Sequence, residues 1–334
     1  MPLFAVTTIT PAALIGIGAF AGSAWIVLAI ISLTILVTLL DRVIPTGGIQ
    51  DESSRGTSLN FALAIIHLIL LPLCVAALAG GWLTTLEKVG LFFAAGLYFG
   101  QVGNANAHEL IHRSGRGLHR LGMWVYISLL FGHHTSAHVL VHHQHVATRA
   151  DPNTSRKGES LYRYIPRAWI GSFRAGYRAE AARLAKINRP AWRNPYVVYV
   201  GGAVAFIVLA LLLGGLEAGI AYVTLAAYAQ IQLLMSDYVQ HYGLERPARP
   251  GGKPVTVGNE HSWNSPHFLS SALMLNATRH SDHHAHPSRA YPALSLPDDA
   301  PMLPKPLPLM ASIALIPPLW RRMMDPLVDR WRHA

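Results

Sequence analysis

The chain has 334 residues, of which 51% are hydrophobic and only 13% charged, and its formal net charge is +10. Soluble domains carry about 25% charged residues, so this composition excludes an ordinary soluble protein and indicates an integral membrane protein. The positive charge does not indicate a nucleic-acid partner, because no basic stripe interleaved with aromatic residues accompanies it. The lone cysteine, Cys74, excludes an intrachain disulfide and a built-in iron–sulfur centre, so any electrons must come from outside.

Six apolar segments approach the length needed to cross a bilayer, whose core of about 30 Å takes roughly 20 helical residues. In chain order they are 4–21, 25–40, 59–78, 89–102, 196–213 and 216–235. The first two are short and could form one tilted span, but Gly22 and Ser23 between them favour two. We therefore expect one all-α membrane-embedded domain over residues 1–334, with about six transmembrane helices.

Residues 144–193 are polar and contain eleven Lys or Arg against three Asp or Glu. The positive-inside rule places such a loop in the cytoplasm. The apolar stretch 118–131 before it is too short for a comfortable span, and we expect an interfacial or re-entrant segment there. From Glu245 onward proline and polar residues dominate around one apolar patch, 307–320, which predicts a cytoplasmic and partly interfacial cap.

Three short motifs concentrate the histidines: HELIH (108–112), SAHVLVHHQH (136–145) and RHSDHH (279–284). Within each motif, histidines stand three or four residues apart, so on an α-helix they share a face and can aim two imidazoles at one metal. The eight motif histidines are His108 and His112, His138, His142 and His143, and His280, His283 and His284. The expected topology brings all three motifs to the cytoplasmic face.

His241 in DYVQHYG (237–243) ends the last span at the same face and makes a plausible ninth ligand. One metal cannot use nine ligands, so the count indicates two metals. Imidazole suits zinc, copper, iron and nickel alike. A dinuclear, nitrogen-rich site with access to a lipid-facing cavity nevertheless suits iron and dioxygen chemistry.

Ligating histidines usually hand their other ring nitrogen to a carboxylate or a carbonyl, which fixes the tautomer. Four carboxylates stand close enough in sequence to serve as such second-sphere partners. They are Glu109, Asp237, Asp282 and Glu260.

Two other classes of protein deserve comparison. HELIH alone could form a zinc protease site with Glu109 as general base, but that reading leaves at least six motif histidines unexplained. A metal transporter or sensor would also use histidine clusters, yet the spans carry few polar residues away from one face.

For His67, alone in an apolar span, we expect a core role. Second-sphere or surface roles are expected for the histidines without a complete motif spacing: His119, His133, His134, His145, His261, His267, His286 and His333.

The motifs HELIHR, HVLVHHQHVATRADP, DYVQHYGL, HSWNS and RHSDHHAHPSRAYPAL make the chain resemble the membrane-bound alkane monooxygenases, within the membrane fatty acid desaturase and hydroxylase superfamily. The resemblance continues through DPNTSRKGES and MMDP. It implies a six-span protein in the cytoplasmic membrane that holds two irons with the eight motif histidines and His241, with the active site facing the cytoplasm. It further implies electrons from a rubredoxin or ferredoxin with its NAD(P)H-dependent reductase, and insertion of one oxygen atom of O2 at the terminal carbon of a medium-chain alkane.

The sequence departs from this family at three places. Ala137 precedes His138 where the family usually has glutamate, VATRADP carries Arg149 and Ala150, and LNATRH and RAYPAL replace the usual runs around the third motif. All nine expected ligands survive, so we expect the chemistry to survive. The departures leave open a desaturase or hydroxylase that acts on a functionalised lipid or an alkyl-aromatic compound with the same metals.

Overall fold

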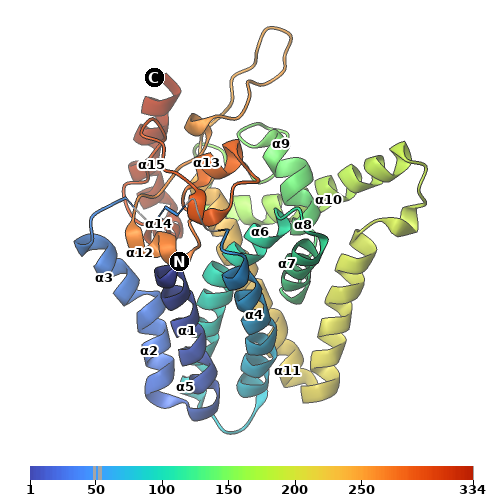
Figure 1. Ribbon diagram of the computed structural model, residues 1–334, viewed down its shortest axis with the longest axis vertical. Coiled ribbons are helices and arrows are strands. Elements are labelled where there is room, and N and C mark those ends of the chain that lie inside the picture. Colours follow the sequence, from blue (N-terminus) through green and yellow to red (C-terminus); the bar gives the residue numbers. More distant parts are fainter. Residues whose placement is uncertain (48–49, 52–54, 334) are drawn as a thin grey trace.

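The structure, a computed structural model, describes residues 1–47, 50–51 and 55–333, and within this part of the chain all regular elements are helices (Figure 1). The α-helices are α1 Pro2–Ala21, α2 Ser23–Leu33, α3 Ile35–Val43, α4 Thr57–Ala79, α5 Thr85–Tyr98, α6 Asn104–Ile111, α7 Arg116–Ser128, α8 His134–Ala137, α9 His143–His145, α10 Leu161–Lys186, α11 Tyr196–His241, α12 Phe268–Leu273, α13 His280–Ala285, α14 Leu307–Ala314 and α15 Pro317–His333. Two π-helices, η1 Phe99–Gly103 and η2 His138–His142, interrupt this series, and η3 Ala191–Arg193, η4 Asn259–His261 and η5 Tyr291–Ala293 are single 3₁₀ turns.

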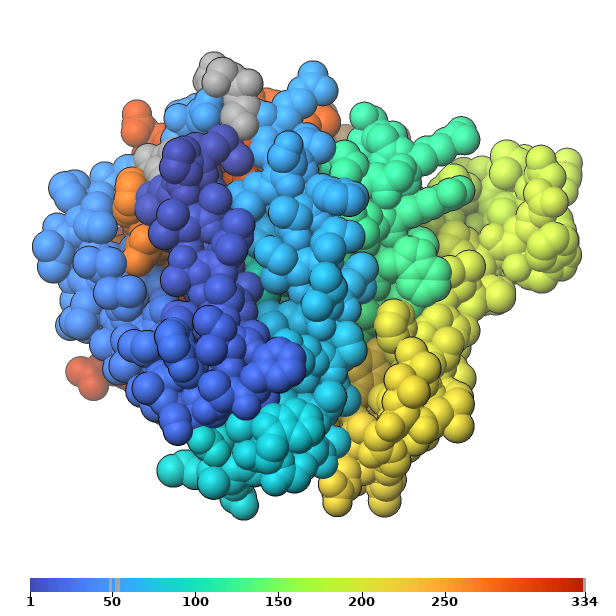
Figure 2. Space-filling view, turned by 60° about the horizontal axis from the view of Figure 1, so that its bottom comes forward, coloured from blue at the N-terminus to red at the C-terminus, as the bar shows by residue number. Residues whose placement is uncertain are grey.

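Four helical stretches in the described residues are long and apolar enough to cross a membrane: Pro2–Ala21, Ser23–Val43, Thr57–Ala79 and Tyr196–His241. Many large apolar side chains remain exposed on them, Phe20, Phe61 and Leu212 among others, as in a protein whose helices face lipid. Figure 2 shows the outer surface that these apolar helices form, with α1 in dark blue, α4 in lighter blue and α11 in yellow. These features belong to an integral membrane protein.

The first two apolar segments are separate helices and not one long span. Gly22 between them adopts φ +61°, a backbone conformation that residues with a side chain rarely adopt. The Glu87 carboxylate at the start of α5 accepts a hydrogen bond from the Ser23 backbone N–H at 2.7 Å. The turn between α1 and α2 is thereby tied to α5.

The helix α11 is broken near its middle, where Gly214 and Gly215 leave helical geometry and Gly215 adopts φ +67°. The two arms fold back on each other, since the rings of Phe206 and Tyr222 lie 6.4 Å apart between centroids. The break falls between the two expected segments 196–213 and 216–235. The element Tyr196–His241 therefore consists of two antiparallel helical arms.

The segment expected to be interfacial or re-entrant forms α7, a helix of 13 residues that packs along α6. After α7 the chain turns and enters α8, so the second histidine motif returns to the end of the molecule where the first motif lies. Helices α6, α8, α9 and α13 lie at this one end (Figure 1). The number of spans stays a prediction, because α5 and η1 form the fourth segment as a shorter, interrupted helix.

The C-terminal segments cover the histidine end of the bundle. The carboxylate of Asp41, at the end of α3, accepts the backbone N–H groups of Leu269 at 2.6 Å and Ser270 at 3.2 Å. Asp41 thereby satisfies free amides at the start of α12 and anchors the cap to the bundle.

Candidate metal centre

Nine histidines from five segments gather into two adjoining groups. The first group holds His108, His112, His138, His143 and His283, and the second holds His142, His241, His280 and His284. Within each group the candidate ligand nitrogens lie within 4.8 Å of one another. The groups touch, since the rings of His143 and His284 are 4.6 Å apart between centroids. These are the nine residues that the sequence singled out, and their metal ligation remains a proposal.

The groups cut across the sequence motifs, which corrects the expectation that each motif aims at one metal. His138 and His142, four residues apart, lie in different groups. Their segment is the π-helix η2, in which the N–H of His143 donates to the carbonyl of His138, five residues earlier. This wider turn places His143 beside His138 and turns His142 to the second group. His283 and His284 are divided in the same way, so only HELIH keeps both histidines in one group.

The spacing of the Nε2 atoms within the groups fits a shared cation. The Nε2 of His138 lies 2.8 Å from that of His108 and 2.9 Å from that of His143. In the second group His280 Nε2 lies 2.9 Å from His241 Nε2 and 3.1 Å from His284 Nε2. Two nitrogens bound at about 2.1 Å to one metal are about 3.0 Å apart at a right angle and about 3.4 Å apart at the tetrahedral angle. The observed spacing is therefore close to that of nitrogens that bind one shared cation.

Burial and the lack of hydrogen-bond partners at some ring nitrogens also make these histidines candidate metal ligands. His112 Nε2 and His142 Nε2 are buried and have no hydrogen-bond partner among the described residues. Burial, reinforced by neighbouring imidazoles, lowers the pKa of His138, His143 and His283 well below the ordinary value. Neutral imidazoles with free lone pairs are what a transition metal requires.

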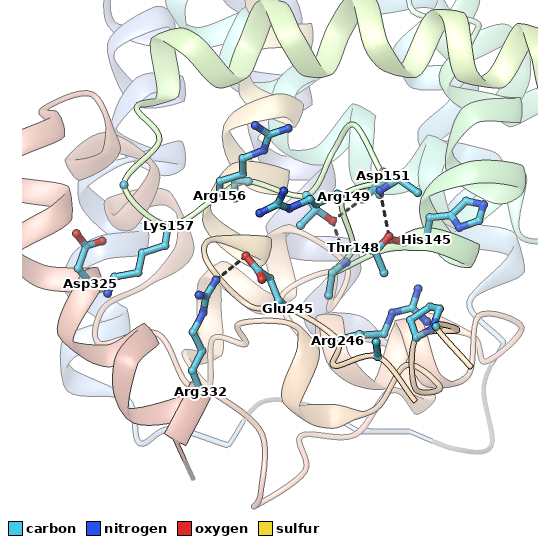
Figure 3. Close-up of a pocket in the computed structure, with 18 residues that line it drawn as sticks. His145, Thr148, Arg149, Asp151, Arg156, Lys157, Glu245, Arg246, Asp325 and Arg332 are labelled. Carbon is cyan, nitrogen blue, oxygen red and sulfur yellow. Dashed lines mark hydrogen bonds and ion pairs between the residues drawn. The ribbon is translucent and has the colours of Figure 1, made fainter. Parts of the chain in front are cut away.

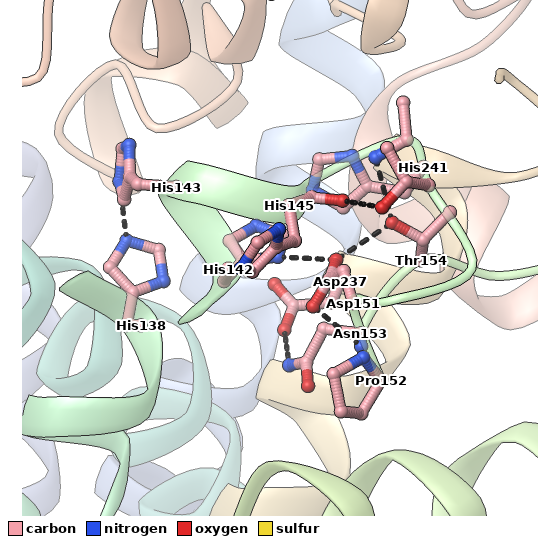
Figure 4. Close-up of polar contacts among 12 residues, drawn as sticks. His138, His142, His143, His145, Asp151, Pro152, Asn153, Thr154, Asp237 and His241 are labelled. Atoms are coloured by element: carbon pink, nitrogen blue, oxygen red, sulfur yellow. Dashed lines mark hydrogen bonds and ion pairs between the residues drawn. The ribbon is translucent and has the colours of Figure 1, made fainter. Parts of the chain in front are cut away.

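His142 differs from these, because it contacts a buried carboxylate. Its Nδ1 lies 2.8 Å from Asp151 Oδ2 (Figure 4). Burial alone would lower the pKa of His142, but the charge and hydrogen bond of Asp151 outweigh burial and raise it. The Thr154 hydroxyl donates to Asp151 Oδ2 at 2.7 Å, and the Asn153 backbone N–H donates to Oδ1 at 3.0 Å. Asp151 thus holds the proton on Nδ1 and leaves Nε2 free for a metal.

The four carboxylates that we expected beside the ligating histidines contact other residues in the structure. Glu109 pairs with Arg113 at 2.7 Å, and Asp237 accepts from Asn153 at 2.7 Å. Asp282 binds Arg289 and His286, neither of which belongs to the two groups, and Glu260 is exposed beside His261. Their role as partners of ligating histidines therefore stays a prediction. Asp151 was missed, because it lies in an irregular loop nine residues beyond His142, where no helical spacing points to it.

The remaining histidines mostly have partners of their own. His67 contacts the Ser128 hydroxyl at 3.0 Å inside the bundle, in keeping with the expected core role. His119 Nδ1 lies 2.8 Å from the carbonyl of Ile111, whereas His134 is buried with its ring 5.0 Å from that of His138. The side chain of His333 lies outside what the structure describes.

Two adjoining cavities lie next to the histidines. The larger, of about 450 Å³, is mostly apolar and lies between α3, α5, α11 and α14. The smaller, of about 50 Å³, is lined by His108, His138 and His280 among others. The residues that line both cavities are Gly100, Gln101, Ser236 and Met274. The π-helix η1 supplies two of these, Gly100 and Gln101, so it forms part of the wall between the apolar cavity and the small cavity beside the histidines.

Comparison with known proteins gives a consistent result. The fatty acid desaturase family profile matches residues 80–308. The chain is 31% identical to alkane 1-monooxygenase 2 of Pseudomonas aeruginosa, over 91% of this chain and 84% of that protein. It is 32% identical to alkane 1-monooxygenase 1 of Alcanivorax borkumensis, over 81% and 69% of the respective chains. It is also 26% identical to the xylene/toluene monooxygenase hydroxylase component of Pseudomonas putida, over 91% and 82%.

Proposed function

The chain belongs to the fatty acid desaturase family and is an alkane 1-monooxygenase-like enzyme, and from this we propose that it hydroxylates the terminal carbon of a medium-chain alkane or a similar alkyl substrate. The observation that carries the proposal is an apolar cavity of about 450 Å³ that shares four lining residues with the small cavity beside His108, His138 and His280. A metal transporter or sensor would need no such cavity, and its relatives would not be named monooxygenases.

The metals in this proposal are two irons, one held by each histidine group. When bound, they would supply the redox chemistry that reduces O2 and attacks an unactivated C–H bond. One oxygen atom enters the alcohol, and the other leaves as water with two protons and two external electrons. The buried imidazoles hold the metals, and Asp151 orients His142.

The protein's own contribution to selectivity is the shape and dryness of the passage. An alkyl chain would lie among apolar side chains such as Leu33, Val37 and Leu97, and its terminal carbon would reach the small cavity beside His108 and His138. Burial of apolar surface, roughly 25 cal/mol per Å², would bind the chain and displace water. We assign no side chain as a general acid or base.

We further propose that the enzyme lies in the cytoplasmic membrane with its histidine end facing the cytoplasm. The excess of Lys and Arg in residues 144–193 supports this orientation through the positive-inside rule. The electrons would come from a rubredoxin or ferredoxin and its NAD(P)H-dependent reductase, because the one cysteine, Cys74, is buried and free.

The test is oxidation of octane and dodecane under ¹⁸O2 by purified protein that contains two irons per chain, with an electron-donor system. We expect alcohol labelled with one ¹⁸O at the terminal carbon. If no labelled alcohol forms from any chain length while both irons are present, the proposal is wrong.

A second candidate is hydroxylation of an alkyl-aromatic compound. The similarity to the xylene/toluene monooxygenase hydroxylase component favours it, since that relative matches over 91% of this chain. Competition between octane and xylene, followed by mass spectrometry of the products, decides between the two substrates.

A further inference from the structure

Helix α10 leaves the helical bundle sideways at the histidine end, and we call its outer end, residues 183–193, the tip (Figure 1). In Figure 2 the yellow-green tip projects beyond the first arm of α11, which is drawn in yellow. The chain runs directly from the tip into this arm, which begins at Tyr196. The tip therefore overhangs the outer surface of an apolar helix that faces lipid.

The tip carries a positive charge that the surrounding protein does not cancel. Lys186, Arg189 and Arg193 are exposed, and no ion pair among the described residues involves any of them. The nearest carboxylate in the sequence is Glu180, and it pairs with Arg183 at 3.6 Å. Three positive charges are therefore left for an occupant of opposite charge.

Large apolar side chains stand among these cations. The side chain of Trp192 is 69% exposed and that of Ile187 is 59% exposed. The guanidinium of Arg193 lies over the Trp192 ring, 5.1 Å from its centroid. Exposed tryptophan next to Lys and Arg is typical of the boundary between a bilayer and water, where the ring lies at the level of the headgroups.

The first arm of α11 supplies an apolar wall next to the tip. Val197, Val200 and Val204 are exposed along this arm. They are three and four residues apart, so they share one face of the helix. An acyl chain that lies along this face would bring its headgroup to the level of the tip.

Charge and location together identify the kind of occupant. A soluble acidic protein or a nucleic acid needs a positive surface that faces water, whereas the tip overhangs a lipid-facing helix. A lipid without net charge fits the apolar wall but gains little from three cations. An anionic lipid fits both, because Lys and Arg near a membrane surface attract anionic headgroups.

We propose that the tip binds the headgroup of an anionic phospholipid whose acyl chains lie along the first arm of α11. Arg189 and Arg193 can each offer two N–H groups to phosphate oxygens, and Lys186 adds a compact charge. Trp192 would lie beside the glycerol and the upper part of the acyl chains. This inference goes beyond the proposed function and does not depend on it.

The test measures quenching of Trp192 fluorescence by lipids that are brominated near the carbonyl end of their acyl chains. The protein is held in phosphatidylcholine nanodiscs with increasing fractions of brominated phosphatidylglycerol or brominated phosphatidylcholine. The signal of Trp192 is the difference between each protein and its Trp192→Phe variant. We expect half-maximal quenching at a fraction of phosphatidylglycerol about tenfold or more below that of phosphatidylcholine.

The triple variant Lys186→Gln/Arg189→Gln/Arg193→Gln should bring the two half-maximal fractions together. High salt should do the same to the wild type, since the Debye length near 1 M is about 3 Å. Metal content checks that each variant is folded.

The matched control Arg149→Gln/Arg249→Gln/Lys253→Gln removes the same number and kind of charges. All three residues are exposed. Arg149 lines a depression of about 990 Å³ between the loop after α9, the chain after α11 and α15 (Figure 3), and the other two lie in the loop between α11 and η4. In Figure 1 these segments lie at the opposite end from the break in α11.

The control should keep the preference of the wild type for phosphatidylglycerol. Equal half-maximal fractions in the wild type, an unchanged preference in the tip variant, or an equal loss in the control overturns the proposal. Because the measurement reports lipid binding, its outcome is independent of whether the wild type hydroxylates alkanes.

Discussion

Among the residues that the structure describes, Asp151 is the carboxylate that contacts a histidine of the two groups, and replacing it removes this contact. Asp151→Ala deletes the hydrogen bond to His142, whose two atoms lie 2.8 Å apart, and leaves a buried Nδ1–H without an acceptor. Loss of such a second-sphere partner typically lowers metal affinity about 10-fold to 100-fold, which corresponds to about 1.4 to 2.8 kcal/mol. Asp151→Asn keeps an amide oxygen that accepts from His142 but loses the charge, so we expect a loss at the lower end of this range.

The assay is metal content per chain after equilibration with graded concentrations of a chelator. A matched control is Asp41→Asn, which alters a buried carboxylate that binds backbone amides of α12 instead of a histidine. We expect the control to retain metal like the wild type at each chelator concentration. If Asp151→Ala also retains metal like the wild type, or if the control loses as much, then Asp151 does not support a ligand and our reading of its contact is refuted.

Three further outcomes follow from the site. His241→Ala should lower iron well below two per chain and abolish hydroxylation, whereas His119→Ala and His286→Ala should keep full iron; full iron in the His241 variant would show that eight histidines suffice. Ser236→Phe narrows the passage between the two cavities, so dodecane hydroxylation should fall more than octane hydroxylation, and an equal fall would place the alkyl chain elsewhere. Turnover with a separately purified donor should decrease as ionic strength rises, and salt-independent turnover would mean that the arginines of residues 144–193 only set topology.

The sequence identified the nine histidines but not their division into two groups. Helical spacing of three and four suggested one metal for each motif, whereas η2 is a π-helix that pairs His138 with His143. Whether a segment becomes a π-helix depends on how it packs in the folded protein, and spacing alone carries no signal of it. The contact between Asp151 and His142 could not be predicted for a related reason, because it depends on the conformation of a loop.

The positions of the apolar helices were easier to predict from the sequence, because the length of an apolar segment is a strong signal for a membrane-spanning helix. Gly214 and Gly215 break α11 where the apolar segments 196–213 and 216–235 were divided. The short stretch before the second motif forms the 13-residue helix α7, and its interfacial or re-entrant placement stays a prediction. The residues that line the cavities next to the histidines could not be predicted from the sequence, since they depend on how η1 packs against α11.

Neighbours in the chain serve different groups at two places, His142 with His143 and His283 with His284. Adjacent Cα atoms are about 3.8 Å apart whatever the surrounding packing does. Covalent backbone geometry therefore ties the two histidine groups together at two places, in addition to the packing of the helices. When a thicker or thinner bilayer tilts the helices, the two histidine groups should therefore move together.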